Sequence, residues 1–185
     1  MAPKRGINLD SDTLIEYDMK IKTAEHEKDD LQLIDGASII GIMGTFNWSV
    51  FTSRIIGDCG AIDISASRLD LAVEATIEVL VSEVQGSFRL CLGCFTSGLH
   101  KEIRLFDGTI GEPEPRSLKR YVIAVVMGTQ LDLKFKVGAG YSSTSERCYS
   151  FTAHDHGHVD QLIETDFASI AVKVTWSVLP PAWPI

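Results

Sequence analysis

Residues 170–178 read IAVKVTWSV, and this stretch decides the fold class. Ile170, Val172, Val174 and Trp176 alternate with smaller or polar residues, among them Lys173. Successive side chains of a β-strand point to opposite faces, so this period of two predicts a strand with one buried face. A helix would instead need apolar residues both three and four positions apart, and the residues three after Ile170 and Val172 are the polar Lys173 and Thr175.

Three other segments repeat the same period, at residues 15–21, 73–81 and 131–137. Turn-forming glycines separate these and several shorter apolar runs. Residues Tyr121–Met127 are almost all apolar, which predicts a strand buried on both faces. The tripeptide Gly128-Thr129-Gln130 then predicts a hairpin into the segment that follows. The best candidate for a helical turn lies around His158–Thr165. We therefore predict an all-β fold, an antiparallel β-sandwich or open barrel of roughly ten strands with little helix.

Length favours a single β-sandwich domain over residues 1–185, because 185 residues suffice for one core and no long linker divides the chain. Residues 1–12 are predicted to be an N-terminal arm, and the proline-rich residues 180–185 a tail. Trp183 lies in that tail, where we expect it to be exposed and a contact point for a partner. Trp176 and Trp48 fall on apolar faces and are expected in the core.

The formal net charge of −8 argues against nucleic-acid binding, because such proteins neutralise phosphates with clustered Lys and Arg. The acidic segments 25–30 and 112–114 instead favour a basic protein partner through electrostatic steering. No apolar run is long enough for a membrane helix, and residues 1–5 lack the apolar core of a signal peptide. We expect a cytoplasmic protein without membrane contact, whose oligomeric state the sequence leaves open.

Three histidines, His154, His156 and His158, form the sharpest local motif. In extended backbone they would point the same way, about 7 Å apart per step, and imidazole is a common ligand of zinc and copper. A fourth ligand is not visible, so a polar surface loop is the alternative. The motif predicts weak, pH-dependent binding of divalent transition metals. We expect no other cofactor.

Other reactive groups do not form a recognisable catalytic pattern. The spacing of Cys91 and Cys94 suits half a zinc site or a redox pair, but residues three apart on a strand point to opposite faces. Glu74 and Glu78 could act as an acid–base pair, although solvated carboxylates on a sheet are more common. Neither a nucleophile elbow nor a phosphate loop is present, so the sequence leans away from an enzyme.

Several segments, taken in order, resemble a plant family catalogued as domain of unknown function 6598. The resemblance is carried by residues 3–7 (PKRGI), 17–22 (YDMKIK), 75–79 (ATIEV), 86–89 (GSFR), 95–98 (FTSG) and 172–177 (VKVTWS). It spans nearly the whole chain. Some members look like the C-terminal module of the jasmonate-induced ribosome-inactivating proteins of cereals, which follows an N-glycosidase domain.

The resemblance implies a stress or defence setting in plants and no catalytic residue. The Glu-x-x-Arg pair of the depurinating domain is not found on a helical segment here. We therefore predict a non-catalytic binding or accessory module that recognises a protein. A carbohydrate-binding, lectin-like module is one alternative. A contribution to ribosome inactivation, as part of an rRNA N-glycosidase defence protein, is another.

Overall fold

The computed structural model describes residues 11–23, 30–41, 49–97, 99–111, 115–138 and 144–178, and within them the chain is all β. Every strand pair is antiparallel and no sheet closes into a barrel, which confirms the predicted fold class. The strands are β1 (Thr13–Ile21), β2 (Leu31–Ile40), β3 (Val50–Gly57), β4 (Gly60–Ser67), β5 (Ala72–Ser82), β6 (Phe88–Thr96), β7 (Leu99–Ile110), β8 (Arg116–Ser117), β9 (Tyr121–Val126), β10 (Gln130–Gly138), β11 (Thr144–Thr152), β12 (Gly157–Glu164) and β13 (Ser169–Ser177). No helix in the described ranges is long and apolar enough to cross a membrane.

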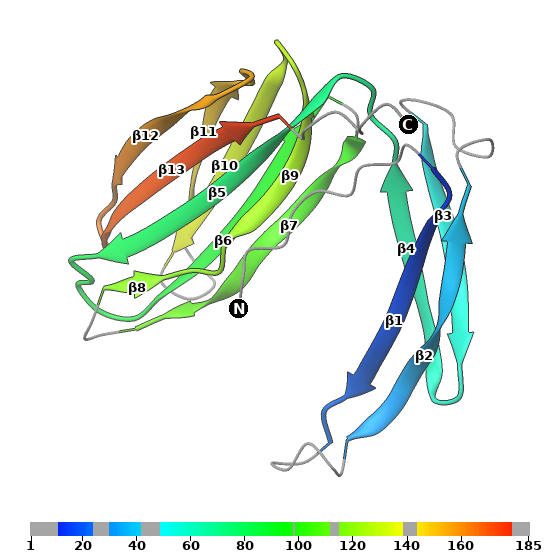
Figure 1. Cartoon of the computed structure of the whole chain (residues 1–185). Coiled ribbons are helices and arrows are strands. Elements are labelled where there is room, and N and C mark those ends of the chain that lie inside the picture. The colour runs from blue at the N-terminus through cyan, green and yellow to red at the C-terminus, as the bar shows by residue number, and fades with distance from the viewer. Residues whose placement is uncertain are drawn as a thin grey trace. The chain divides into compact units, whose positions relative to one another are not determined.

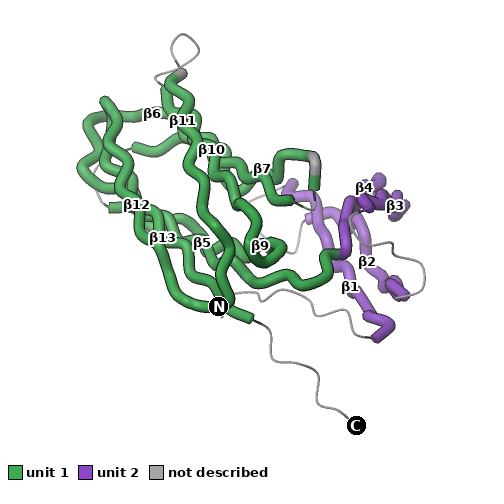
Figure 2. The backbone as a smooth tube through the Cα atoms, turned by 90° about the horizontal axis from the view of Figure 1, so that it is seen from above, with its two compact units in different colours: residues 1–7, 69–185 green, residues 8–68 purple. Residues whose placement is uncertain are grey.

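Two compact units divide the chain, residues 8–68 and residues 1–7 with 69–185 (Figure 2). The predicted single domain over residues 1–185 stays a prediction, because two compact units can still unfold together. Most of the predicted arm, residues 1–10, and the tail at 180–185 lie outside the described residues.

The unit of residues 8–68 contains two hairpins, β1–β2 and β3–β4. They meet where Gly57 ends β3, since a Cβ atom built on Gly57 would lie only 1.8 Å from the carbonyl oxygen of Leu33. Arg54 and Asp63 form an exposed ion pair across β3 and β4, with 2.7 Å between Nε and Oδ1. Glycine is therefore required at position 57 because the backbones approach too closely for any side chain.

The larger unit is a sandwich of two sheets (Figure 1). One sheet has the strand order β11-β10-β6-β7. The other has the order β12-β13-β5-β8, and β9 also pairs with β5. Strand β5 is thus central, with β13 along one edge and both β8 and β9 along the other. Strand β12 lies at the end of its sheet.

The core of the sandwich confirms the alternation read from the sequence. The inward residues of β5, β10 and β13 at 73–81, 131–137 and 170–176 are all buried. Trp176 is buried in this core, as expected. Burying one large aliphatic side chain contributes about 1.5–3 kcal/mol to stability, so the burial of this core is the main stabilising contribution in the unit. Trp48, also expected in the core, lies outside the described residues.

The apolar face predicted for residues 15–21 is only partly buried. The strand itself is present as β1, and Tyr17 is buried. Met19 and Ile21, however, are 39% and 37% exposed, so the prediction is wrong for the end of the strand. The physical reason is that β1 belongs to a two-stranded sheet with a bulge between Met19 and Lys20, rather than to a sheet of the sandwich.

Residues 121–127 are also less buried than their sequence suggests. Only Val125 and Val126 of this segment are buried, and Met127 is 46% exposed. The reason is that β9 pairs with β5 alone and lies at a sheet edge. The predicted hairpin is likewise wrong, because β9 and β10 belong to different sheets. The turn at Gly128, with its φ of 77°, carries the chain from one layer to the other.

The predicted helical turn at residues 158–165 is a strand, β12, paired with β13 from Gly157↔Trp176 to Glu164↔Ser169. The adjacent aliphatic residues Leu162 and Ile163 obscured its period of two. Ile163 points into the core and is buried, whereas Leu162 points outward. Backbone pairing with β13 overrides the weak local preference of this segment.

Two residues with positive φ bracket the central strand. Leu71 (φ 55°) precedes β5, and Glu83 (φ 53°) follows it. Both conformations are costly for residues other than glycine, and Leu71 is also 83% exposed. The carboxylate of Glu83 accepts a hydrogen bond of 2.8 Å from Ser169 Oγ, which helps to hold the chain in this turn.

Candidate functional site

A shallow depression lies on the outer face of the five-stranded sheet, across β12, β13, β5 and β8. Its volume is about 220 Å³. Pockets that enclose small molecules are usually larger, in the range of roughly 300–1,000 Å³. The shape is that of an open surface on which another chain could lie, not that of a cavity that shields a reaction from water.

One row of this surface is apolar. Leu162 on β12 lies opposite Ala171 on β13, which lies opposite Leu80 on β5. Leu162 and Leu80 are 57% and 43% exposed. The row ends at Ser117 on β8, opposite Leu80. Leu162 and Leu80 thus flank Ala171 in a small apolar row, and an exposed apolar patch is a candidate contact surface.

The neighbouring row is charged, with signs that alternate across the sheet. Asp160 on β12 lies opposite Lys173 on β13, which lies opposite Glu78 on β5. Arg120, next to β9, continues the alternation, with its Nε 2.5 Å from Glu78 Oε1. Glu78, one of the carboxylates considered for acid–base chemistry, is therefore an ion-pair partner here. The other, Glu74, is buried and lies four residues earlier on the same face of β5.

The free edge of β12 borders this surface. The hairpin that joins β12 to β13 closes with a bond from the N–H of Thr165 to the carbonyl oxygen of Ala168. Because backbone groups alternate in direction along an antiparallel strand, the even-numbered residues of β12 point away from β13. Two side-chain bonds agree: Gln161 Nε2 donates to the oxygen of Leu162, and Arg147 Nη1 donates to that of Glu164. In the described ranges no strand pairs with this edge.

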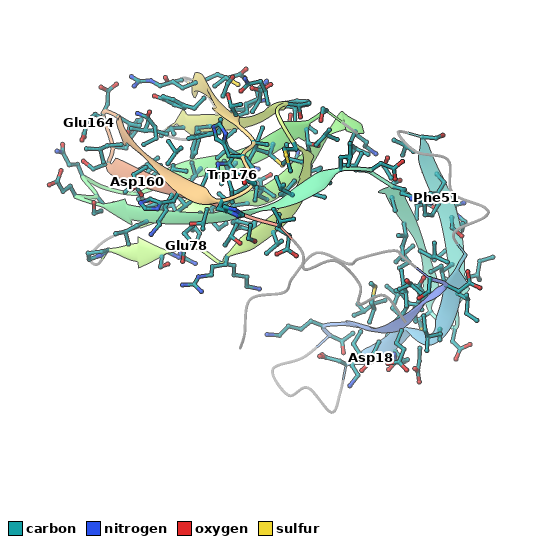
Figure 3. The ribbon with its side chains drawn as sticks, turned by 45° about the horizontal axis from the view of Figure 1, so that its top comes forward. Asp18, Phe51, Glu78, Asp160, Glu164 and Trp176 are labelled. Atoms are coloured by element: carbon teal, nitrogen blue, oxygen red, sulfur yellow. The ribbon has the colours of Figure 1, made fainter. Side chains whose placement is uncertain are left out.

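Several contacts hold the β12–β13 hairpin in place. The ring of Phe167, at its tip, stacks on Phe88 of the opposite sheet with 5.7 Å between the ring centroids. The N–H of Gln85 donates to the carbonyl oxygen of Phe167. Ser169 Oγ lies 2.7 Å from Glu164 Oε2 at the end of β12. The edge is therefore presented by a fixed strand. Figure 3 labels Asp160 and Glu164 on this orange strand and Glu78 on green β5.

The three histidines do not share one extended segment. His154 lies before β12, and the chain bends at Asp155 and His156. Gly157 then has a φ of 106°, so the backbone is not extended between the first and the third histidine. His156 Nε2 lies 3.1 Å from Asp155 Oδ2, and His158 Nε2 lies 3.6 Å from Asp160 Oδ2.

All three histidines are exposed, and among the described residues no three His, Cys, Asp or Glu side chains gather in a group that could hold a metal ion. Weak metal binding by His154, His156 and His158 stays a prediction, which a calorimetric titration with zinc checks.

All four cysteines are free thiols. Cys94 is fully buried, whereas Cys91 lies on the other face of β6 and is half-buried. Burial, together with the nearby charge of Glu102, raises the pKa of the Cys94 thiol to about 12. A thiol with so high a pKa is a poor nucleophile at neutral pH. Cys59 and Cys148 are exposed, and partial desolvation of the Cys148 thiol raises its pKa.

Trp176, predicted to lie in the core, is the one tryptophan within the described residues. Its ring is buried at the end of β13, opposite Gly157 and Ala75. Its indole N–H has no hydrogen-bond partner in the part of the chain that the structure describes. Trp183, proposed above as an exposed contact, lies outside the described residues, as do residues 25–29 and 112–114 of the acidic segments.

Sequence reasoning missed the residues of the β12 edge, because it assigned this segment to a helical turn. The signal was present in the polar residues His158, Asp160 and Glu164, which alternate with the apolar residues Val159 and Ile163 but also with the polar Gln161. Leu162 interrupts that alternation, since it is apolar yet lies on the outer face.

A family model described as Domain of unknown function (DUF6598) matches residues 1–174, which is most of the chain. No curated protein and no solved structure matches it.

Proposed function

Since this chain belongs to the family described as Domain of unknown function (DUF6598), a description that assigns no activity, we propose that it is a non-catalytic binding module for a protein partner. The binding surface in this proposal is the outer face of the five-stranded sheet together with the free edge of β12.

The observation that supports this proposal is the juxtaposition of the apolar row and the free edge. Leu162 contributes to both, with its side chain in the row and its backbone directed away from β13. A partner chain could therefore bury aliphatic surface and form backbone hydrogen bonds at the same place. This combination of edge and surface is used in strand addition, a common mode of peptide recognition.

The setting that we propose is a plant stress or defence response in the cytoplasm. The plant setting is supported by the ordered motifs that resemble the module behind the N-glycosidase domain of cereal ribosome-inactivating proteins. The cytoplasmic location is supported by four cysteines that are all free, as is usual for proteins in reducing compartments.

A comparative pull-down from cereal leaf extract tests the proposal. The immobilised chain is used as the wild type, as Leu162→Asp and as Leu14→Asp. The two leucines form a matched pair, because both lie on strands and are 57% and 58% exposed. We expect a reproducible partner protein that binds the wild type and Leu14→Asp but is lost with Leu162→Asp.

A partner that binds all three forms equally, or the absence of any reproducible partner, would contradict the proposal. Two further assays address the other function classes. Clear selectivity for one sugar class on a glycan array would favour a lectin-like module. Release of adenine from ribosomes with inhibition of translation would favour an enzyme.

A further inference from the structure

The side chains of β12 and of its flanking turns are mainly acidic, and two cations border them: Lys173 lies opposite Asp160, and Arg147 donates to the carbonyl oxygen of Glu164. Residues 148–172 contain four carboxylates and no Lys or Arg. All four carboxylates, those of Asp155, Asp160, Glu164 and Asp166, belong to exposed residues. Cationic residues of a partner would therefore be attracted to this edge.

Three residues of β12 offer a partner two kinds of group each, a side chain and a backbone amide. Along β12, Asp160, Leu162 and Glu164 have their side chains on the outer face of the sheet and their backbone groups toward the free edge. The carbonyl oxygens of Leu162 and Glu164 each accept one side-chain bond already, but a carbonyl oxygen can accept two. A further antiparallel strand would thus find three residues available for backbone pairing, at every second position.

The rows across the sheet indicate which side chains that strand would carry. In the charged row the sign alternates from Arg120 through Glu78 and Lys173 to Asp160, so the next position suits a cation. In the apolar row, Leu162 is the last member and suits another apolar side chain. Directly opposed residues on one face of an antiparallel pair interact most strongly, with opposite charges favourable and like charges unfavourable.

We infer that the β12 edge binds an extended basic segment of the partner as an additional antiparallel strand, with basic residues opposite Asp160 and Glu164 and an apolar residue opposite Leu162. This inference rests on the proposed function and adds the chemistry of the partner. The recognised pattern is basic-x-apolar-x-basic, because only alternate residues of the added strand share a face with β12.

The same charges disfavour a second copy of this chain as the occupant. If two β12 strands paired antiparallel about Leu162, Asp160 of each would lie opposite Glu164 of the other. If they paired about Asp160, the two Asp160 carboxylates would lie opposite each other. Like charges in directly opposed positions are destabilising, which is one way in which sheet edges avoid self-association.

A synthetic seven-residue peptide tests the inference. It carries Lys at its second and sixth positions, Leu at its fourth and Thr at the others. Titrated into the ¹⁵N-labelled full chain, it is expected to shift the amide signals of residues 158–164. A peptide with Glu in place of both Lys residues is expected to bind at least about tenfold more weakly, since two favourable pairs become repulsive.

Backbone methylation separates an added strand from a peptide that merely lies on the surface. N-methyl groups on the two Lys residues and the Leu would remove the N–H groups that face β12, and binding should be lost. N-methyl groups on the intervening Thr residues face away from β12, and binding should persist. Equal binding by the two methylated peptides would overturn the inference.

Variants of the chain provide matched controls. Asp160→Asn with Glu164→Gln should weaken binding of the Lys peptide about tenfold. Asp132→Asn with Glu146→Gln removes as many charges from the outer face of the other sheet and should leave binding within about twofold. Asp160→Lys with Glu164→Lys should instead favour the Glu peptide, a gain that misfolding could not produce.

Failure of this inference can be distinguished from failure of the proposed function. If no signal of residues 158–164 shifts with the Lys peptide, or if both charged peptides bind alike, the basic added strand is wrong. The binding module would still stand if Leu162→Asp abolishes capture of a partner that Leu14→Asp retains. If neither the peptide nor any extract protein binds, both fail.

Discussion

The guanidinium of Arg147 on β11 donates a hydrogen bond of 3.0 Å to the backbone carbonyl oxygen of Glu164 on β12. The two strands lie at the edges of different sheets, so this bond joins the layers along one side of the sandwich. We expect Arg147→Gln to lower the free energy of unfolding by about 0.5–1.5 kcal/mol, as is usual for one hydrogen bond. Urea unfolding measures this, with Arg116→Gln, another exposed strand arginine, as the control. Equal effects of the two substitutions would show that the bond contributes nothing.

A second prediction concerns the close approach of Gly57 to Leu33. The Cβ atom of an alanine at position 57 would overlap the backbone oxygen of Leu33, so one of the hairpins would have to move. We expect Gly57→Ala to destabilise residues 8–68 by about 1–3 kcal/mol. Gly36→Ala is the control, because a Cβ atom there meets nothing within 4 Å. Hydrogen exchange of the β2 and β3 amides reports the effect, and equal protection in both variants would contradict it.

The buried thiol of Cys94 predicts a pH dependence of stability. Its pKa is raised to about 12 in the folded chain, from 9.0, mainly by burial. Below pH 9 the thiol is protonated in both states and its contribution is fully present. Above pH 9 the unfolded chain loses the proton first, so the free energy of unfolding falls by up to about 1.4 kcal/mol per pH unit until the folded thiol also ionises.

The variant Cys94→Ala should lack this part of the alkaline slope, although the cavity lowers its stability at every pH. Urea unfolding at several pH values between 8 and 11 measures both slopes, and the other groups that titrate in this range are common to the two proteins. Parallel slopes would show that burial of Cys94 does not couple folding to its ionisation.

Leu133 offers a test of the predicted single domain. It is completely buried in the core of the sandwich, and Leu133→Ala should cost about 2–5 kcal/mol. If the two compact units unfold together, calorimetry will show one transition that moves to lower temperature as a whole. Two transitions, of which only one moves, would instead establish two domains.

The sequence predicts those features that depend on one strand at a time. Alternation at Val73–Val81, Leu131–Val137 and Ile170–Trp176 correctly identified strands and their buried faces, because in a sandwich the second layer covers the apolar side of each. It failed where burial depends on neighbours. Met19 and Ile21 alternate as clearly, but they lie in a two-stranded sheet where less of that face is covered.

The candidate surface was predicted least well. Its charged and apolar rows arise from the register of β12, β13 and β5, and residues such as Leu80, Ala171 and Leu162 are far apart in sequence. No local pattern indicates which residues of different strands become neighbours. The sequence could have identified β12 as a strand, but its place at the edge of the sheet follows only from the complete pairing order.

The two left-handed residues at the ends of β5 have a consequence for assembly. A slip of this strand by one residue would turn its buried aliphatic side chains toward water. The slip would also move the turns, so that the residues next to Leu71 and Glu83 would have to adopt the left-handed conformation instead. Because β13, β8 and β9 all pair with β5, the two turns fix the register of four strands in the folded sheet.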